Sequence, residues 1–89
     1  MKIKIELFGV SRDFSEKGLL ELDINKNSTI KDVRNKIINY LDINFSGNDN
    51  FKKIVNSSAF CSNDNNIISD NYKITNNEII AIIPPIGGG

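Results

Sequence analysis

The sequence predicts an α+β domain in which a mixed β-sheet packs against one main helix. Three patterns support this prediction: two alternating strands near the start, one amphipathic helix in the middle, and one continuous apolar strand near the end. The chain has 89 residues, which is enough for one hydrophobic core and too few for two. We therefore expect a folded domain over residues 1–83 and an extended C-terminal tail over residues 84–89.

Two segments near the N-terminus alternate polar and apolar residues, as a strand with one buried face does. The first is residues 2–7, Lys-Ile-Lys-Ile-Glu-Leu, and the second is residues 20–24, Leu-Glu-Leu-Asp-Ile. Residues 11–18 between them are polar and end in glycine, so we expect a hairpin loop. The two strands should therefore pair antiparallel.

The middle of the chain has the spacing of an amphipathic helix. Apolar residues recur at intervals of three, four and four, and one more widens the apolar stripe: Ile30, Val33, Ile37, Leu41 and Ile38. Ser28 or Thr29 can cap the first turn, and Thr29 with Asp32 makes a weak capping box. These signals predict a helix over about residues 29–42.

The segment after this helix is rich in turn residues, and its elements are short. Residues 44–50 are expected to form a loop, whereas residues 51–56 could form a short helical turn that leads into a strand. Short strands are expected at residues 59–61 and 67–68, on either side of a turn.

The last strand does not alternate. Residues 78–83, Glu-Ile-Ile-Ala-Ile-Ile, form the continuous apolar run of a central strand covered on both faces. Residues 71–77 before it are expected to be a polar connection, in which Asn77 could adopt a left-handed turn. One helix covers only one face of a sheet, so this strand leaves apolar surface on the other face unless loop residues such as Phe51 cover it. The sequence leaves both alternatives open.

The order of these elements matches one known arrangement of strands. It runs strand, strand, helix, short strands, final strand, as in the β-grasp fold, where a mixed sheet wraps around one helix. The last strand then lies in the middle of the sheet, parallel to the first. A tail that follows this strand would leave the domain from a rigid base.

Composition excludes several classes of function. Eleven Lys and Arg balance eleven Asp and Glu, so we expect no nucleic-acid partner and no membrane partner. There is no His, and Cys61 is the one cysteine, so we expect no metal site, no bound cofactor and no internal disulfide. No glycine-rich phosphate loop, membrane-length apolar run or signal peptide occurs, and we expect a cytosolic protein.

The strongest functional signal is the closing segment, Pro84-Pro85-Ile86-Gly87-Gly88-Gly89. The prolines end the strand and set the exit direction, and Ile86 offers an apolar anchor. Six extended residues span roughly 18–20 Å, and glycines can enter a slot too narrow for side chains. The carboxylate of Gly89, once activated as an acyl-adenylate, could become a nucleophilic thiocarboxylate. The alternative is a disordered glycine tail or an expression remnant, which the preceding Pro-Pro-Ile disfavours.

The chain resembles the small subunit of molybdopterin synthase, the MoaD family of ubiquitin-like sulfur carriers. The family closes on an acidic turn, a short apolar strand, Pro-Pro, an aliphatic residue, a variable residue and Gly-Gly. Here Glu78, residues 80–83 and residues 84–89 match this pattern in register. A weaker match is residues 8–13, Phe-Gly-Val-Ser-Arg-Asp, against the family's F-A-x-x-R-E. Gly87 departs from the Ser, Thr or Ala that is common at the variable position.

The resemblance implies a sulfur carrier that is not an enzyme by itself. Gly89 would be adenylated by an E1-like enzyme that consumes ATP, converted to a thiocarboxylate, and would donate sulfur to cyclic pyranopterin monophosphate in molybdenum cofactor biosynthesis. The partner would be the large subunit of molybdopterin synthase, in a heterotetramer of two small and two large subunits. The partner-binding tail would comprise Pro84, Pro85, Ile86, Gly87 and Gly88.

Three other functions stay open. One is a ubiquitin-related modifier that serves tRNA thiolation or protein conjugation, which also ends in Gly-Gly. Another is the thiamin-pathway sulfur carrier, which is usually shorter and lacks the Pro-Pro-Ile context. The last is a plain binding module with an incidental tail. The spacing of Pro-Pro-Ile favours molybdopterin synthase.

Some reactive or charged side chains have a simple structural interpretation. Cys61 could accept a persulfide or a thioester, but beside Phe60 it is expected to be a small packing residue. The pair Lys52-Lys53 is expected to be solvated, although it could contact a partner. The pair Arg12-Asp13 is expected to form a salt bridge in a loop.

Overall fold

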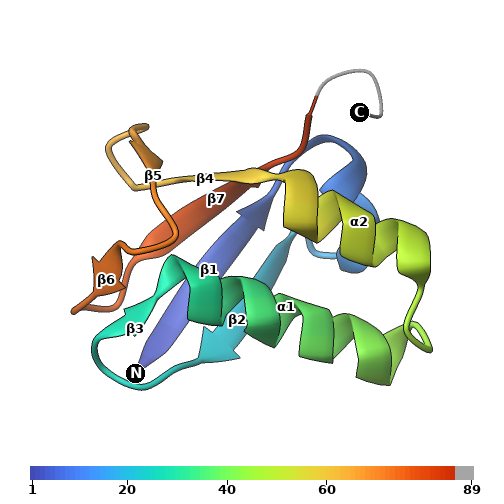
Figure 1. Cartoon of the computed structure of the whole chain (residues 1–89), viewed down its shortest axis with the longest axis horizontal. Helices are drawn as coiled ribbons and strands as arrows, with labels where there is room; N and C mark the ends of the chain where they lie inside the picture. The colour runs from blue at the N-terminus through green and yellow to red at the C-terminus, as the bar shows by residue number, and fades with distance from the viewer. Residues whose placement is uncertain (86–89) are drawn as a thin grey trace.

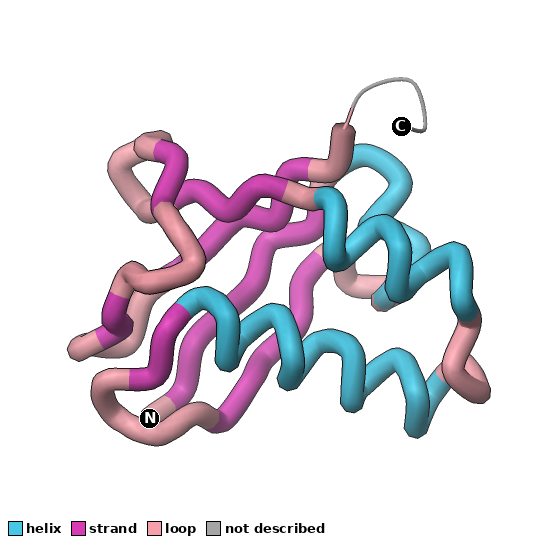
Figure 2. Tube along the Cα trace, in the orientation of Figure 1, coloured by secondary structure: helices cyan, strands magenta, loops and turns pink. Residues whose placement is uncertain are grey.

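A computed structural model describes residues 1–85 of the chain and contains two β-sheets and two α-helices (Figure 1). Its elements are β1 (Lys2–Leu7), the 3-10 helix η1 (Gly9–Phe14), β2 (Leu19–Asp23), β3 (Ser28–Thr29), α1 (Ile30–Asn44), α2 (Asp49–Ser57), β4 (Ala59–Cys61), β5 (Ile67–Ile68), β6 (Lys73–Ile74) and β7 (Ile79–Ile83). The main sheet has the order β2-β1-β7-β4-β5, and β3 pairs with β6 in a small second sheet. Both helices lie on one side of the main sheet (Figures 1 and 2).

The strand pairing confirms the predicted fold class. β1 is antiparallel to β2 and parallel to β7, so the last strand lies in the middle of the main sheet beside the first. β4 pairs antiparallel with the other side of β7. An α+β mixed sheet with this order, packed against one main helix, is the β-grasp arrangement that the sequence predicts.

The exposure of β7 corrects one prediction. Ile80 and Ile82 are fully buried on the face toward the helices, here called the inner face, whereas Ile79 and Ile83 are exposed on the outer face. A strand in the centre of a sheet is flanked on both edges but needs a cover on one face only. Although all residues of β7 are apolar, their burial alternates along the strand, and β7 is not covered on both faces.

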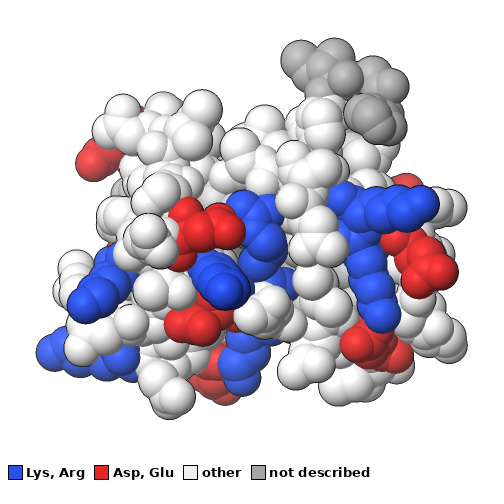
Figure 3. All heavy atoms as spheres, in the orientation of Figure 1, with Lys and Arg blue, Asp and Glu red and all other residues white. Residues whose placement is uncertain are grey.

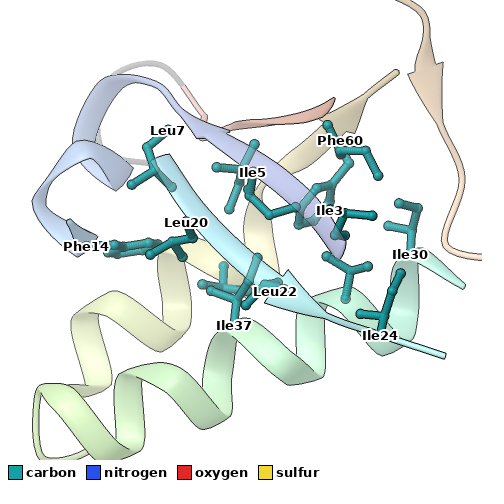
Figure 4. Packing of buried hydrophobic residues seen from close by; sticks show 14 of the residues in the cluster. Ile3, Ile5, Leu7, Phe14, Leu20, Leu22, Ile24, Ile30, Ile37 and Phe60 are labelled. Carbon is teal, nitrogen blue, oxygen red and sulfur yellow. The ribbon is translucent and has the colours of Figure 1, made fainter. Parts of the chain in front are cut away.

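The core lies between the inner face of the main sheet and the helices (Figure 4). The buried residues of α1 are the apolar stripe of the sequence pattern, Ile30, Val33, Ile37 and Leu41. Phe51 also belongs to this side, since its ring centroid is 5.1 Å from that of Phe14 and 5.2 Å from that of Phe45. Phe51 therefore does not cover the outer face, and this settles the alternative that the sequence left open.

The helix boundaries follow from capping side chains. At the start of α1, Thr29 Oγ1 accepts from the Asp32 N–H at 3.4 Å and Asp32 Oδ2 accepts from the Thr29 N–H at 2.9 Å, which confirms the capping box. Asn48 Oδ1 accepts from the Phe51 N–H at 3.1 Å and starts α2. The segment left undecided is thus a helix. The predicted loop over 44–50 is shorter, because Asn44 belongs to α1 and residues 49–50 belong to α2.

The expected hairpin between β1 and β2 is confirmed by their antiparallel pairing, but its connection is more ordered than a plain loop, and the left-handed turn suggested for Asn77 is wrong. The predicted hairpin loop contains the 3-10 helix η1, in which Ser11 and Phe14 are buried. Asn77 has no positive φ; the non-glycine residues that do, within residues 1–85, are Asn27, Ser46 and Asn65. The chain is already extended beside β1 at this point, because the Lys4 N–H donates to the Glu78 carbonyl at 3.1 Å.

None of the helices within residues 1–85 is long and apolar enough to cross a bilayer.

Arg34 on α1 holds three segments together. Its Nη1 donates to the carbonyls of Val55 at 2.6 Å and Ser58 at 2.8 Å, and its Nη2 donates to Asp70 Oδ1 at 2.8 Å. The guanidinium carbon lies 4.8 Å from the centroid of the Phe60 ring. This one side chain ties α1 to the end of α2 and to the loop before β6.

Arg34→Met should lower the free energy of unfolding by about 2 kcal/mol, because it keeps the apolar stem and removes the hydrogen bonds to two carbonyls. Urea unfolding followed by circular dichroism measures this change. Arg12→Met, at an exposed position, is the control and should stay within about 0.5 kcal/mol of the unchanged protein. Equal losses in the two variants would contradict the role given to Arg34.

Tyr72 predicts a dependence of stability on alkaline pH. Burial, and after it the charge of Glu78, raises the pKa of the Tyr72 hydroxyl, which lies 3.2 Å from Glu78 Oε1. The folded state therefore keeps this proton at pH values where the unfolded state loses it, so the contribution is full below about pH 10 and decreases above it. The free energy of unfolding of Tyr72→Phe should fall less steeply above this pH than that of the unchanged protein. Urea unfolding at several pH values measures this difference. If the free energies of unfolding of the two proteins fell equally steeply above about pH 10, the prediction would be contradicted.

Candidate functional site

The base of the predicted tail is the end of β7. Ile82 lies opposite Leu7 of β1 on one side and Phe60 of β4 on the other, so the strand is held along both edges. Pro84 follows and is buried, whereas Pro85 is exposed. The structure therefore brings the two prolines to the end of a central strand, as the sequence predicts.

The remaining tail residues, Ile86, Gly87, Gly88 and Gly89, lie outside the described part of the chain. Their predicted roles, including that of the Gly89 carboxylate, stay predictions. The site that the structure does describe is the surface around the tail base.

An apolar surface covers half of the outer face of the main sheet. Residues directly opposite each other in paired strands point to the same face, so the side chains beside Ile79 and Ile83 can be identified from the register. We call this surface the outer patch; it comprises Ile79, Ala81 and Ile83 of β7, Ala59 and Cys61 of β4, and Ile67 of β5. Ile67 is 77% exposed, Ile79 40% and Ile83 38%.

The other half of the outer face is charged. On β1 and β2, Lys2 lies opposite Asp23 and Lys4 lies opposite Glu21, so opposite charges face each other. A hollow of about 240 Å³ lies where the two halves meet at the start of β7, and its lining includes Lys4, Glu78 and Ile79. The apolar residues thus gather on the strands that surround the tail base and not over the whole sheet.

Two more exposed apolar residues lie at the same end of the sheet. Phe8 follows β1, and Val10 is part of η1, which contacts β7. They add exposed apolar surface near the end of β7, where the chain leaves the domain. An exposed patch of this kind in a small domain usually marks a binding site for another protein. The sequence pattern of β7 predicts Ile79 and Ile83, whereas Phe8 and Val10 give no pattern signal of their own.

The ion pairs of the structure differ from the predicted ones. Within residues 1–85 the salt bridges are Arg34–Asp70 and Lys52–Asp42. The prediction of a salt bridge between Arg12 and Asp13 is therefore wrong. Lys52 is also not simply solvated, since its Nζ lies 2.7 Å from Asp42 Oδ1, and this hydrogen bond raises the pKa of the ammonium group. On the helical side, positive and negative side chains alternate over the surface (Figure 3).

Cys61, which the sequence analysis expects to be a small packing residue, belongs to the outer patch and not to the core. It is half-exposed on the outer face, whereas the neighbouring Phe60 is fully buried on the inner face. No group of three His, Cys, Asp or Glu side chains that could hold a metal ion occurs among residues 1–85. The described residues therefore present an exposed apolar surface beside the point where the chain leaves the domain.

Comparison with known proteins supports the fold. No protein-family model and no curated protein sequence matches the chain. Among solved structures, SAMP1 from Haloferax volcanii aligns with a TM-score of 0.71 at 15% identity and covers 100% of both chains. A putative molybdopterin converting factor, subunit 1, from Pyrococcus furiosus aligns with a TM-score of 0.71 at 11% identity, covering 97% of this chain and 99% of that one. The ubiquitin of Caldiarchaeum subterraneum aligns with a TM-score of 0.62 at 20% identity, covering 100% and 98%.

These likenesses and the strand order define a class of domain. The chain has the ubiquitin-like β-grasp fold, over essentially the whole length of each compared protein. At such low identities the likeness concerns the fold alone, and the fold hosts several functions.

Proposed function

We propose that this protein is the sulfur carrier subunit of molybdopterin synthase and that the carboxylate of Gly89 is its working group. The observation that supports this most is that the outer patch and the tail share one strand: β7 exposes Ile79 and Ile83 and then leads directly into Pro84. A partner that covers this patch is therefore beside the chain exit. The Pro-Pro-Ile-Gly-Gly-Gly sequence fits a narrow channel in such a partner.

The proposed chemistry takes place at the end of the backbone. An oxygen of the Gly89 carboxylate attacks the α-phosphate of ATP, and pyrophosphate leaves. A persulfide of the activating enzyme then attacks the acyl carbon, so that a carbon–sulfur bond forms and AMP leaves. A second thiol reduces the resulting acyl disulfide, which yields the thiocarboxylate of the carrier and a disulfide on the enzyme side.

Two proteins would use the same surface in turn. The E1-like enzyme must reach the carboxylate, and the large subunit of molybdopterin synthase must reach the thiocarboxylate, so both have to bind beside the tail base. Catalytic side chains would belong to these partners. The heterotetramer of two small and two large subunits follows from the family resemblance, and the likeness to the Pyrococcus furiosus protein is in keeping with this assignment.

Reconstitution tests the proposal. The full chain, an E1-like enzyme, ATP, a sulfur donor and the large subunit are mixed with cyclic pyranopterin monophosphate, and molybdopterin is measured by the fluorescence of its oxidised form. We expect product in proportion to the carrier, and none when ATP is omitted. Absence of product with a carrier that is adenylated normally would rule out this pathway.

A protein modifier is the second candidate function. The alignment with SAMP1, a small archaeal modifier protein, equals the alignment with the molybdopterin factor in TM-score. This function requires an isopeptide bond between Gly89 and lysines of other proteins. Mass spectrometry of lysine-linked C-terminal peptides from the native cell distinguishes the two, because a dedicated sulfur carrier leaves no such adducts.

A further inference from the structure

We infer that the turn formed by Phe8, Gly9, Val10 and Ser11 is a seat for Pro84, and that this seat sets the direction in which the tail leaves the domain. The inference rests on the proposed function, because a direction matters only if a partner receives the tail. It adds residues far from Gly89 in the sequence to the groups that position the reacting carboxylate.

The contact between Pro84 and Gly9 supports this inference. Pro84 is buried although it lies past the last paired residue of β7, which is Ile83 opposite Ala59. A Cβ atom built on Gly9 would lie 3.9 Å from both Cδ and Cγ of the Pro84 ring. This distance is an ordinary van der Waals contact, so the ring lies directly beside Gly9, at the turn that opens η1 (Figure 1 shows the start of η1, in blue, beside the end of β7).

The seat is held in shape by its own hydrogen bonds. The Ser11 side chain is fully buried; its Oγ donates to the Phe8 carbonyl at 2.6 Å and accepts from the Phe8 N–H at 3.0 Å. The Ser11 N–H also donates to the Phe8 carbonyl, at 3.1 Å. Gly9 has a φ of +54°, which a glycine adopts at little cost. This turn thus keeps its geometry without any contribution from the tail.

The seat has a mechanical consequence for the tail. Within the described residues, the strand pairing that constrains β7 ends at Ile83. Contact of the Pro84 ring with the turn at Gly9 holds the ring, and with it the Cα–C bond of Pro84, in one orientation. Rotation about that bond is restricted in turn because Pro85 follows. Pro85, which is exposed, then starts from a defined orientation. Such pre-organisation reduces the entropy that is lost when the tail enters a partner.

Two matched glycine variants distinguish an effect on the direction of the tail from an effect on the stability of the fold. Gly9 and Gly18 both have positive φ, +54° and +72°, but a Cβ on Gly18 would meet nothing within 4 Å. Gly9→Asn and Gly18→Asn therefore carry a similar backbone cost, since Asn tolerates this region, and only Gly9→Asn adds a side chain next to the Pro84 ring. The assay is ATP–pyrophosphate exchange by an E1-like enzyme from the same cell, with each full-length variant as the acceptor.

We expect Gly9→Asn to lower kcat about tenfold while KM stays within about twofold, because the folded body still docks and the carboxylate is misdirected. Gly18→Asn should match the unchanged protein in both constants. Equal kcat values for the two variants, or an effect on KM alone, would overturn the inference.

The proposed function and this inference can fail separately. If the unchanged protein supports no exchange, the proposed function is wrong. The seat is then judged by NMR relaxation of the Pro85 Cα in the free protein. Its order parameter should fall in Gly9→Asn and not in Gly18→Asn, and identical values would refute the seat.

Discussion

Extension of the chain by one alanine after Gly89 is expected to lower the rate of adenylation by at least about 100-fold. An added residue moves the carboxylate by about 3.5 Å and places a methyl group where the channel admits only backbone. A misplacement of about 1 Å at a reacting group can already cost about 100-fold in rate. ATP–pyrophosphate exchange and molybdopterin formation are the measurements.

The folded domain should not be affected by this extension. The core ends at Ile82, and Pro84 is the last buried residue of the described chain, so the urea midpoint should stay unchanged. One alanine added before Met1 is the control, since Met1 lies at the far end of the parallel pair β1–β7. Normal adenylation of the C-terminally extended chain would mean that the carboxylate of Gly89 is not the reacting group.

The double variant Ile79→Asp, Ile83→Asp is expected to weaken binding of the large subunit by about 100-fold, which is about 2.7 kcal/mol. Both side chains are more than one third exposed in the free protein, so the change should affect the interface more than the fold. Binding would leave two carboxylates buried without partners, and this desolvation cost accounts for the loss. Isothermal titration calorimetry measures the affinity.

The charged half of the outer face provides the matched control. Lys2→Ala with Asp23→Ala removes an opposed pair on the same face, and we expect the Kd to change by less than about fivefold, as for charges at a rim. Thermal unfolding of both double variants checks that they remain folded. An equal loss of affinity in both would show that the partner covers the whole face and that the outer patch has no special role.

Local patterns in the sequence predicted the parts of the fold that depend on burial along one element. β1 and β2 alternate strictly, and the apolar stripe of α1 matches its buried residues. The capping box at Thr29 and Asp32 was also visible, because both partners lie within one turn. In these segments the chain's own spacing determines which side chains face the core.

The parts that the sequence did not predict depend on contacts between distant segments. β3 and β6 are two residues each, and Ser28 pairs with Ile74, so no local pattern marks either strand. The burial of Ile80 and Ile82, with Ile79 and Ile83 exposed, depends on which face the helices cover. Arg34 lies outside the apolar stripe of α1, and no local pattern shows that it donates to carbonyls of α2 and of the residue that caps α2, Ser58.

In the candidate site, too, contiguous features could be predicted from the sequence, whereas contacts between distant segments could not. The Pro-Pro-Ile-Gly-Gly-Gly motif is contiguous, so the tail and its chemistry could be predicted from the sequence. The burial of Pro84 on Gly9 could not, because these residues meet only when β1 and β7 lie side by side. The outer patch was predicted as one of two alternatives, and the position of Phe51 decided between them.

The measurement that tests the central claim most directly is the intact mass of the protein isolated from its native cell, with sequencing of the C-terminal peptide by tandem mass spectrometry. The account predicts a chain that closes on Gly89, with a fraction in which one terminal oxygen is replaced by sulfur, and recovery of this fraction together with a larger protein. A chain that continues past Gly89, or a terminus that stays an ordinary carboxylate in cells that make molybdopterin, would contradict it.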